Sequence, residues 1–447
     1  FWGWSGAQTR DPDLPGYTVV STPVEGVRLD TFSADGQLLV ISIAGRDLRP
    51  GERVEMDYGA GRLGATVDRF SERASPLWVA VDGDGDGVRA VLPDSPVVPV
   101  AAGPAALMVL TLPSIARPGE PVRLTVAILD AVGNAGVEFA GPISLEGTPP
   151  GAQVPESITL DTSAGGLATV TITFPFPGTY RLVGTTADGI MGASNPVVVS
   201  PGGSRIFWGD LHGHSALSDG TATPEDYLAY ARDAAGLDVV ALTDHDHWGL
   251  VFLDQAPSLW KEIRDQNERF YEPGSFVTLL GYEWTNWSHG HRHVLYFDGS
   301  GEVLSSMDPN YDTPTELWAA LRGHNALTVA HHSAGGPVAT NWDYAPDHEL
   351  EPVTEVVSVH GSSEAFDSPH PIYSAVEGNF VRDALDRGFI LGFIGSGDSH
   401  DGHPGLAHLA SPGGSGLAAV LSERLTRESI REALRERRVY ATNGARI

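Results

Sequence analysis

Histidine and acidic residues recur directly after short apolar runs in the second half of this 447-residue chain. The segment GDLHGHS contains His212 and His214, and VVALTDHDH contains His245. The segment GSGDSH contains Asp398 and His400. Imidazole nitrogens and carboxylate oxygens are ligands that zinc, manganese and iron accept in proteins. We therefore expect these side chains to bind divalent metals.

Further candidate ligands follow the same pattern. They are Asp219 in the turn SDG, Glu283 in GYEW, His291 and His293 in GHRHVLYF, and the adjacent pair His331 and His332. The two histidines of each HxH pair point to one face if the segment is a strand. Glu283 suits a bridging role, because neighbouring cations repel each other unless they share an anionic ligand. A single histidine is more often a packed or surface residue, but burying so many titratable groups is costly unless cations neutralise them.

Parallel strands are the elements that would position these ligands. Residues 238–242 are rich in Val and Leu and follow an amphipathic stretch that ends at Gly236, which is typical of a buried strand after a helix. Thr223 is placed to cap that helix, and Pro224 to occupy its first position. An α/β barrel presents the C-terminal ends of its strands for chemistry. We expect such a barrel over residues 201–447.

The first 200 residues differ in kind from the rest. Short alternating segments, such as residues 122–128 and 168–174, are separated by Gly, Pro and Asp, which is typical of β-sandwiches. We expect a β-sandwich module over residues 1–103 and an Ig-like β-sandwich over residues 104–200. The predicted fold class is thus multidomain, with all-β sandwich modules followed by an α/β barrel.

A second candidate metal site lies in the first of these modules. The segment VDGDGDG places Asp82, Asp84 and Asp86 at alternate positions, as at the start of a calcium-binding loop. Position 12 of such a loop would be Pro93 rather than a glutamate. The alternative is therefore an acidic turn without an ion, although three close carboxylates repel each other unless a cation neutralises them.

The composition narrows the range of partners. The formal net charge is −29, and Lys261 is the one lysine. Strong nucleic-acid binding is not expected, because it needs a basic surface that displaces counterions. No run of 18 apolar residues occurs, so we expect no membrane span. We expect the chain to be exported to the periplasm, the cell surface or the medium, with its start at Phe1 produced by trimming.

The ordered set DLHGHS, SDG, TDHD, GYEW, HVLY, AHH and GDSH over residues 205–447 resembles the PHP (polymerase and histidinol phosphatase) superfamily of metal-dependent phosphoesterases. The preceding β modules, with WVAVDGDGDG and SNPVVV, resemble the DUF3604 branch of that superfamily. The resemblance implies a distorted (β/α)7 barrel with two or three divalent metals. It also implies that relatives continue beyond residue 447.

The resemblance assigns the ligands to a trinuclear metal centre. One metal would be bound by His212, His214, Glu283 and Asp398; a second by Glu283, His293 and His331; and a third by Asp219, His245 and His400. His291 is an alternative to His293, and His332 is an alternative to His331. The metals would be zinc, manganese or iron.

The expected reaction is hydrolysis of a phosphomonoester or phosphodiester by a metal-bridging hydroxide. A nearby acid must protonate the leaving oxygen, and we single out His360, His332 and Asp246 as catalytic candidates. Asp246 and His247 could instead orient ligands. The alternative functions are hydrolysis of an amide or lactone, and surface binding by a protein whose metal cluster is structural.

Two further sets of side chains concern the substrate, which we expect to be a small molecule or phosphoester. Four tryptophans near the ligand segments could line a pocket for a sugar, base or lipid, or could simply pack in the core: Trp248, Trp284, Trp287 and Trp342. Arg292 lies between His291 and His293, so it should point away from the metals and is a weak candidate for phosphate binding.

Overall fold

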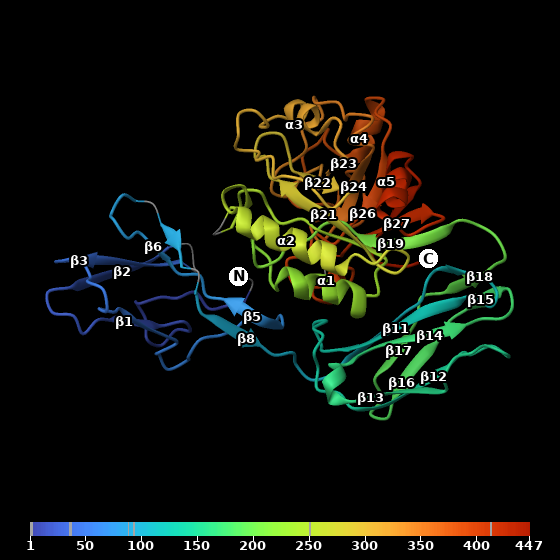
Figure 1. Ribbon diagram of the computed structural model, residues 1–447, viewed down its shortest axis with the longest axis horizontal. Coiled ribbons are helices and arrows are strands. Elements are labelled where there is room, and N and C mark those ends of the chain that lie inside the picture. Colours follow the sequence, from blue (N-terminus) through green and yellow to red (C-terminus); the bar gives the residue numbers. More distant parts are fainter. Residues whose placement is uncertain (1–2, 35–37, 88, 93, 250–251, 412–413) are drawn as a thin grey trace. The chain divides into compact units, whose positions relative to one another are not determined.

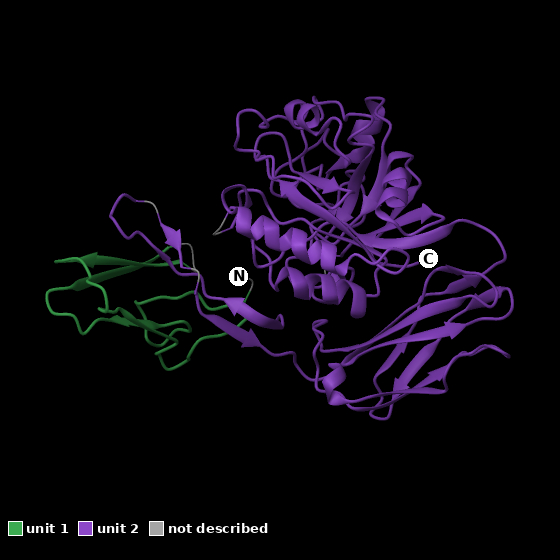
Figure 2. Cartoon of the chain, viewed as in Figure 1, with its two compact units in different colours: residues 1–69 green, residues 70–447 purple. Residues whose placement is uncertain are grey.

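The computed structural model describes residues 3–34, 38–87, 89–92, 94–249, 252–411 and 414–447. The chain is mostly β and multidomain, and it divides into two compact units, residues 1–69 and 70–447 (Figures 1 and 2). The predicted boundaries near residues 103 and 200 therefore stay predictions. Pro93, the residue that departs from a calcium-loop pattern, lies outside the described residues.

Unit 1 consists of two antiparallel strand pairs. They are β1 (Thr18–Ser21) with β4 (Glu55–Tyr58), and β2 (Arg28–Ala34) with β3 (Leu38–Ala44). In the described part of this unit, large hydrophobic side chains such as Phe32 and Met56 are half exposed rather than buried. Two-stranded sheets of this kind bury little apolar surface and have little stability of their own.

Unit 2 begins with short strands that lead into a β region with one apolar core. The leading pairs are β5 (Glu72–Pro76) with β8 (Val97–Val100), and β6 (Ala80–Val81) with β7 (Ala90–Val91). Three small sheets follow: β9 (Leu107–Thr111), β11 (Pro121–Leu129) and β14 (Leu167–Thr173); β12 (Gly141–Glu146), β13 (Ser157–Leu160), β16 (Val183–Thr186) and β17 (Met191–Ala193); and β10 (Ile115–Ala116), β15 (Gly178–Tyr180) and β18 (Val197–Val199). A short helical turn, η1 (Thr162–Ala164), lies between β13 and β14.

These sheets pack around one core of fully buried side chains that includes Leu124, Val126 and Ile143. The arrangement is consistent with the Ig-like sandwich expected for residues 104–200. Alternate residues of β12 and β13 are buried, because every second side chain of a half-buried strand faces the core.

The rest of unit 2 is built on one curled sheet of ten strands in the order β25-β24-β23-β22-β21-β20-β19-β27-β28, with β26 also paired to β24 (Figure 1). The strands are β19 (Arg205–Asp210), β20 (Val239–Leu242), β21 (Val277–Trp284), β22 (Arg292–Tyr296), β23 (Ala326–Ala330), β24 (Val353–Ser358), β25 (Gly361–Ser362), β26 (Gly392–Gly395), β27 (Leu417–Ser422) and β28 (Val439–Thr442). Strands β20 to β23 are buried along their whole length, which explains their continuous apolar runs.

The sheet is mixed: β27 is antiparallel to β19 and β28, and β22 interrupts the parallel strands that carry candidate ligands. β19, β20 and β21 are parallel, and so are β23, β24 and β26, but β22 is antiparallel to both β21 and β23. The beginning of β22 therefore lies at the same edge as the C-terminal ends of its neighbours. A bridge between Gly213 and Ser399 joins the segments that follow β19 and β26, so the sheet curls back on itself at this edge.

The described helices are few. They are α1 (Pro224–Asp233), α2 (Pro257–Phe270), α3 (Pro314–Leu321), α4 (Val381–Asp386) and α5 (Arg427–Arg435), with the short turns η2 (Leu253–Gln255) and η3 (Ala407–Leu409). α1 begins as predicted: the Thr223 hydroxyl accepts the Asp226 N–H, and Pro224 occupies the first turn. A regular (β/α)7 barrel is not confirmed, since the sheet is mixed and has few helices. None of the described helices is both long and apolar enough to cross a membrane.

Candidate metal centre

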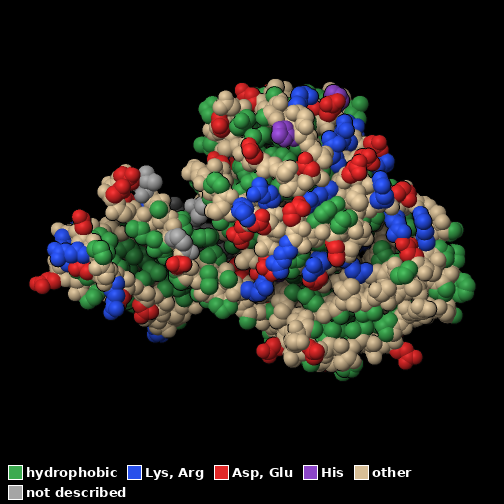
Figure 3. Space-filling view, viewed as in Figure 1, with side chains coloured by type: hydrophobic (Ala, Val, Ile, Leu, Met, Phe, Trp, Pro, Cys, Tyr) green, Lys and Arg blue, Asp and Glu red, His purple; other side chains and the backbone are tan. Residues whose placement is uncertain are grey.

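Eight histidines and three carboxylates converge at the curled edge of the ten-stranded sheet, and we call them the histidine cluster. They are His212, His214, Asp219, His245, Glu283, His291, His293, His331, His332, Asp398 and His400. The cluster contains every metal ligand that the sequence predicted for residues 201–447, including both members of the two ambiguous pairs. Most of these side chains are buried. On the face shown in Figure 3, histidine accordingly appears only at isolated points.

Glu283, at the end of β21, lies at the centre of the cluster. Its Oε2 atom is 3.1 Å from His212 Nε2 and 3.4 Å from His214 Nε2. Its Oε1 atom is 2.6 Å from His291 Nδ1 and 3.3 Å from His245 Nδ1. One carboxylate therefore contacts four histidines from three segments, as a bridging ligand would.

Asp398 completes the group that contains His212 and His214. Its Oδ1 atom lies 3.3 Å from His212 Nε2 and 3.5 Å from His214 Nε2. Asp398 has a left-handed backbone, with φ of 51°. Such a conformation costs free energy in a non-glycine residue and often occurs at functional sites, where the surroundings enforce it.

A second group surrounds Asp219, which the turn SDG carries back toward the sheet. The Asp219 Oδ1 atom lies 3.4 Å from His245 Nε2, 3.4 Å from His400 Nε2 and 3.8 Å from His214 Nδ1. These four residues could hold one ion, since one ligand atom from each lies within 4.8 Å of the others. His214 thus lies between this group and Asp398.

A third set of histidines comes from β22 and from the end of β23. His293 is paired directly with Glu283 in the antiparallel ladder, and its ring stacks on His331 at a centroid distance of 4.1 Å. His293 and His331 form one candidate group with His212 and Glu283; His291, His331 and His332 form another with Glu283. The structure therefore keeps both members of each ambiguous pair near Glu283.

Burial and charge act against each other in the cluster. Burial lowers the pKa of His212 to about 3, even though Asp398 and Glu283 favour its charged form. Burial also opposes charge on His245, but the carboxylates of Glu283 and Asp219 outweigh it and raise the pKa of His245 to about 9. Burial would raise the pKa of Glu283, but the neighbouring histidines hold it well below its usual value. The metal-free cluster therefore retains protons at some positions that a bound cation would replace.

The donor atoms fit a divalent transition metal. Among the described residues, both ring nitrogens of His293 and Nδ1 of His331 are buried without a hydrogen-bond partner. Buried polar atoms are normally satisfied, so these nitrogens point to a partner such as an ion. Nitrogen and carboxylate donors suit zinc, manganese and iron alike.

Three buried carboxylates outside the predicted ligand set support the ligands: Glu355, Asp210 and Asp244. Glu355 Oε2 lies 3.0 Å from His212 Nδ1, the ring nitrogen that faces away from Glu283. Asp210 accepts hydrogen bonds from Gly397 N at 2.7 Å and Gly405 N at 2.8 Å, which joins β19 to the segment after β26. Burial raises the pKa of Asp210 to about 7. The available sequence signal was a single acidic residue inside or ending an apolar strand.

The third supporting carboxylate is Asp244. It accepts hydrogen bonds from Ser215 N at 2.8 Å and Ser218 Oγ at 2.5 Å. Both serines belong to the loop that carries His214 and Asp219. Asp244 therefore fixes the path of the chain between these two candidate ligands.

The three catalytic candidates lie in different surroundings. His360 Nε2 lies 3.0 Å from Asp398 Oδ2, and the His360 side chain is 21% exposed. His332 is buried in the cluster with a positive φ of 34°. Asp246 instead accepts the N–H groups of Thr285 and Ser306, which favours an orienting role over catalysis.

The β region that precedes the ten-stranded sheet contacts the loop that carries His400. Asn134 Oδ1 accepts the Ser71 N–H at 2.9 Å and lies 3.0 Å from His403 Nε2. Asn134 Nδ2 donates to Asp130 Oδ2 at 2.7 Å. A loop of the predicted Ig-like module is therefore hydrogen-bonded to the chain three residues beyond a candidate ligand.

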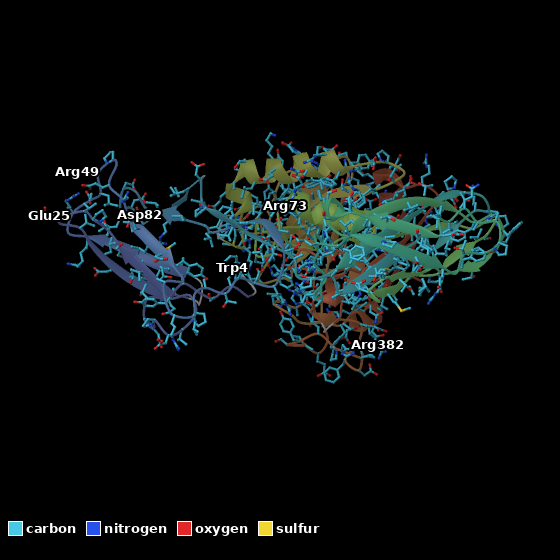
Figure 4. All side chains as sticks on the ribbon, turned by 90° about the horizontal axis from the view of Figure 1, so that it is seen from below. Trp4, Glu25, Arg49, Arg73, Asp82 and Arg382 are labelled. Atoms are coloured by element: carbon cyan, nitrogen blue, oxygen red, sulfur yellow. The ribbon has the colours of Figure 1, made fainter. Side chains whose placement is uncertain are left out.

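A similar contact reaches the loop that carries Asp219. Glu72 Oε2, on β5, accepts the Ala222 N–H at 3.0 Å. Thr221 N in turn donates to His400 O at 2.9 Å, so the two ligand loops are joined. Next to Glu72 lies Arg73, which is labelled in Figure 4. Its guanidinium pairs with Glu225 and Asp226 at the start of α1.

The predicted calcium ligands lie apart from the histidine cluster, in the turn between β6 and β7. Asp82, Asp84 and Asp86 are exposed, with one oxygen of each within 4.8 Å of the others. The Asp82 carboxylate accepts the Gly85 N–H at 2.7 Å and the Gly87 N–H at 3.0 Å. These bonds also occur in an acidic turn without an ion, so calcium binding stays a prediction.

The tryptophans divide into two pairs. Trp284 and Trp342 are buried, and each donates its indole N–H to a backbone carbonyl, so they pack in the core. Trp248 and Trp287 are 44% and 45% exposed. Arg292 is fully buried and pairs with Glu351 at 2.9 Å, on the side of β22 away from the ligands.

Comparison with known proteins supports part of the expected relationship. A family model described as "Protein of unknown function (DUF3604)" matches residues 252–410 and 406–447. The matched residues include the cluster members from Glu283 onward. His212, His214, Asp219 and His245 precede the matched part.

Two sequence relatives are described as uncharacterized proteins. An uncharacterized protein of Chlamydia pneumoniae is 27% identical over 292 residues, which cover 61% of this chain and 45% of that protein. One of Chlamydia trachomatis is 27% identical over 296 residues, with the same shares. The match thus spans less than half of the length of these relatives.

Two solved structures show a remote likeness to this chain. A two-domain protein of Bacteroides vulgatus, described as containing a predicted PHP-like metal-dependent phosphoesterase, has 19% identity and a TM-score of 0.39, covering 53% of this chain and 64% of that chain. The D00-D0 domain of intimin has 16% identity and a TM-score of 0.19, covering 41% of this chain and 84% of that chain.

Proposed function

We propose that this protein is a metal-dependent phosphoesterase that uses the histidine cluster of a distorted (β/α)7, PHP-type barrel. The observation that carries the proposal is the convergence of eight histidines and three carboxylates at one edge of the sheet. Burying so many titratable groups together is costly unless cations neutralise them. The ordered motifs resemble those of the PHP superfamily, and this resemblance is the reason for proposing phosphoester hydrolysis as the reaction.

The groups of close ligand atoms suggest how a trinuclear centre would be held. The first metal would be bound by His212, His214, Glu283 and Asp398. His293 and His331, with His291 and His332 as the alternatives, would hold a second metal that shares Glu283. Asp219, His245 and His400 would hold the third, and the proximity of His214 to Asp219 makes it an additional candidate ligand there.

The chemistry would be divided between the metals and the protein. Bound divalent cations would supply an activated water and positive charge opposite the phosphoryl oxygens. Glu355 orients His212 through Nδ1, and the Thr285 hydroxyl, 2.7 Å from His245 Nδ1, orients His245. His360, which is partly exposed beside Asp398, would donate a proton to the leaving oxygen.

The test is hydrolysis of nitrophenyl phosphate and bis-nitrophenyl phosphate by metal-depleted protein that has been reloaded separately with zinc, manganese or iron. Bound metal is measured in parallel by mass spectrometry. We expect metal-dependent turnover of at least one ester, and its loss in His212→Ala. His348→Ala is the matched control, because His348 is 83% exposed and outside the cluster.

Each outcome of this test has a definite meaning. Turnover of one ester in preference to the other would identify the bond type. A fully loaded cluster that hydrolyses neither ester would contradict the proposal and favour an amide or lactone substrate, or a structural cluster in a binding protein. Failure of the protein to retain metal would contradict the metal site itself.

A further inference from the structure

Trp248 and Trp287 form a half-exposed aromatic pair beside the histidine cluster. Their ring centroids are 5.0 Å apart, and their planes are inclined by 54°. The Trp287 ring lies 5.3 Å from His291, and the Trp248 ring lies 6.5 Å from His245. Two large apolar side chains that stay partly in water next to candidate ligands indicate a binding surface.

Hydrogen bonds hold Trp287 in place before any ligand binds. The Trp287 indole N–H donates to His247 Nε2 at 3.2 Å, and His247 Nδ1 lies 2.7 Å from Asp246 Oδ1. Asp246 is itself fixed by the Ser306 N–H at 2.7 Å. Both nitrogens of His247 are thus engaged, which makes it a positioning residue rather than a metal ligand. A side chain that is already ordered loses little conformational entropy on binding.

The arginine nearest to the candidate ligands in the sequence does not face the metal site, so binding of a substrate's organic part would depend on the aromatic pair. Arg292, which lies between two candidate ligands in the sequence, is buried and paired with Glu351. It is therefore not presented to a substrate at the metals. Recognition of the organic part of a substrate would then depend on the two indoles, whose faces stack well on planar rings.

We propose that Trp248 and Trp287 form a stacking site for a planar aromatic ring that the substrate carries on its phosphoryl group. The substrate class would be aryl or nucleobase-bearing phosphoesters. This inference rests on the proposed phosphoesterase function, because it places the phosphoryl group at the histidine cluster and the ring against the indoles.

The test compares the binding of phenylphosphonate and methylphosphonate to the metal-loaded protein by calorimetry. The two probes share one charged head group and differ in the ring. We expect phenylphosphonate to bind about 10-fold more tightly. Trp248→Ala and Trp287→Ala should each reduce this preference for the probe with the ring, which calorimetry measures as a smaller ratio of the two affinities.

A matched control is Phe176→Ala, which removes a 60% exposed aromatic ring from the predicted Ig-like module. It should leave the affinities for both phosphonates unchanged. Trp287→Ala removes the hydrogen bond to His247. Among the described residues the Trp248 side chain makes no hydrogen bond, so Trp248→Ala decides the test if Trp287→Ala folds poorly. Trp287→Phe keeps the ring and should keep most of the preference.

The results separate failure of this inference from failure of the proposed function. Equal affinity for the two phosphonates, or an unchanged preference in Trp248→Ala, would overturn the stacking site while nitrophenyl ester turnover still supported the enzyme. Ester turnover without detectable phosphonate binding would also overturn it. Absence of both turnover and phosphonate binding in a metal-loaded protein would overturn the proposed function.

Discussion

At the scale of single residues, Glu355 gives His212 its orientation. Its carboxylate lies beside the His212 nitrogen that faces away from Glu283. Loss of such an outer partner typically weakens metal binding about 10- to 100-fold. We therefore expect Glu355→Leu to weaken metal binding by that factor in a chelator competition. Glu355→Gln should retain most of the affinity, because its amide oxygen can still accept a hydrogen bond; equal losses in the two variants would contradict this role.

The protons on the cluster lead to a prediction about pH. Glu283 and Asp219 raise the pKa of His245 to about 9, so this side chain is protonated at neutral pH when metal is absent. A metal must displace that proton, and each proton released makes binding stronger as the pH rises. We expect the apparent metal affinity to increase from pH 6.5 to pH 8.5, measured by competition with a chelator of known protonation. A flat profile would contradict the displacement of a proton from His245 by metal.

At the scale of elements, the predicted Ig-like module contributes to the site through the loop that contains Asn134. Asn134→Ala would leave Ser71 N, His403 Nε2 and Asp130 Oδ2 without this partner. An unsatisfied buried polar group costs about 1 to 3 kcal/mol. We expect a loss of that size in the free energy of unfolding, measured with urea, together with weaker metal binding. The control is Asn443→Ala, because Asn443 is exposed. If Asn134→Ala lowered the free energy of unfolding no more than this control, the role of Asn134 would be contradicted.

The sequence predicted elements best where local chemistry decides them. Thr223 and Pro224 marked the start of α1, where the structure has the predicted cap and first turn. The direction of β22 could not be predicted, because it depends on which strands pair across the sheet. The support from Glu355 and Asp210 was missed for the same reason: their partners lie far away along the chain.

At the scale of the whole molecule, the two units differ in how much core they have. The main core of unit 2 joins Ala127 and Leu129 of the Ig-like region to Trp208 and Tyr227, so this unit should unfold cooperatively. Unit 1, in its described part, buries no large hydrophobic side chain. We expect calorimetry to show a weak early transition and a main transition. Metal should raise the midpoint temperature of the main transition only, since a ligand stabilises the unit that binds it. An equal rise in both midpoint temperatures would contradict separate unfolding of the two units.

The order of the ligands along the chain also bears on synthesis. Candidate ligands extend from His212 to His400 and come together only through pairings between distant strands. Contacts of this kind form slowly, because long loops must close first. A chain emerging from the ribosome would therefore acquire its full set of ligands only after the segment with Asp398 and His400 had been made. Metal uptake would then act as a late checkpoint that separates finished molecules from incomplete ones.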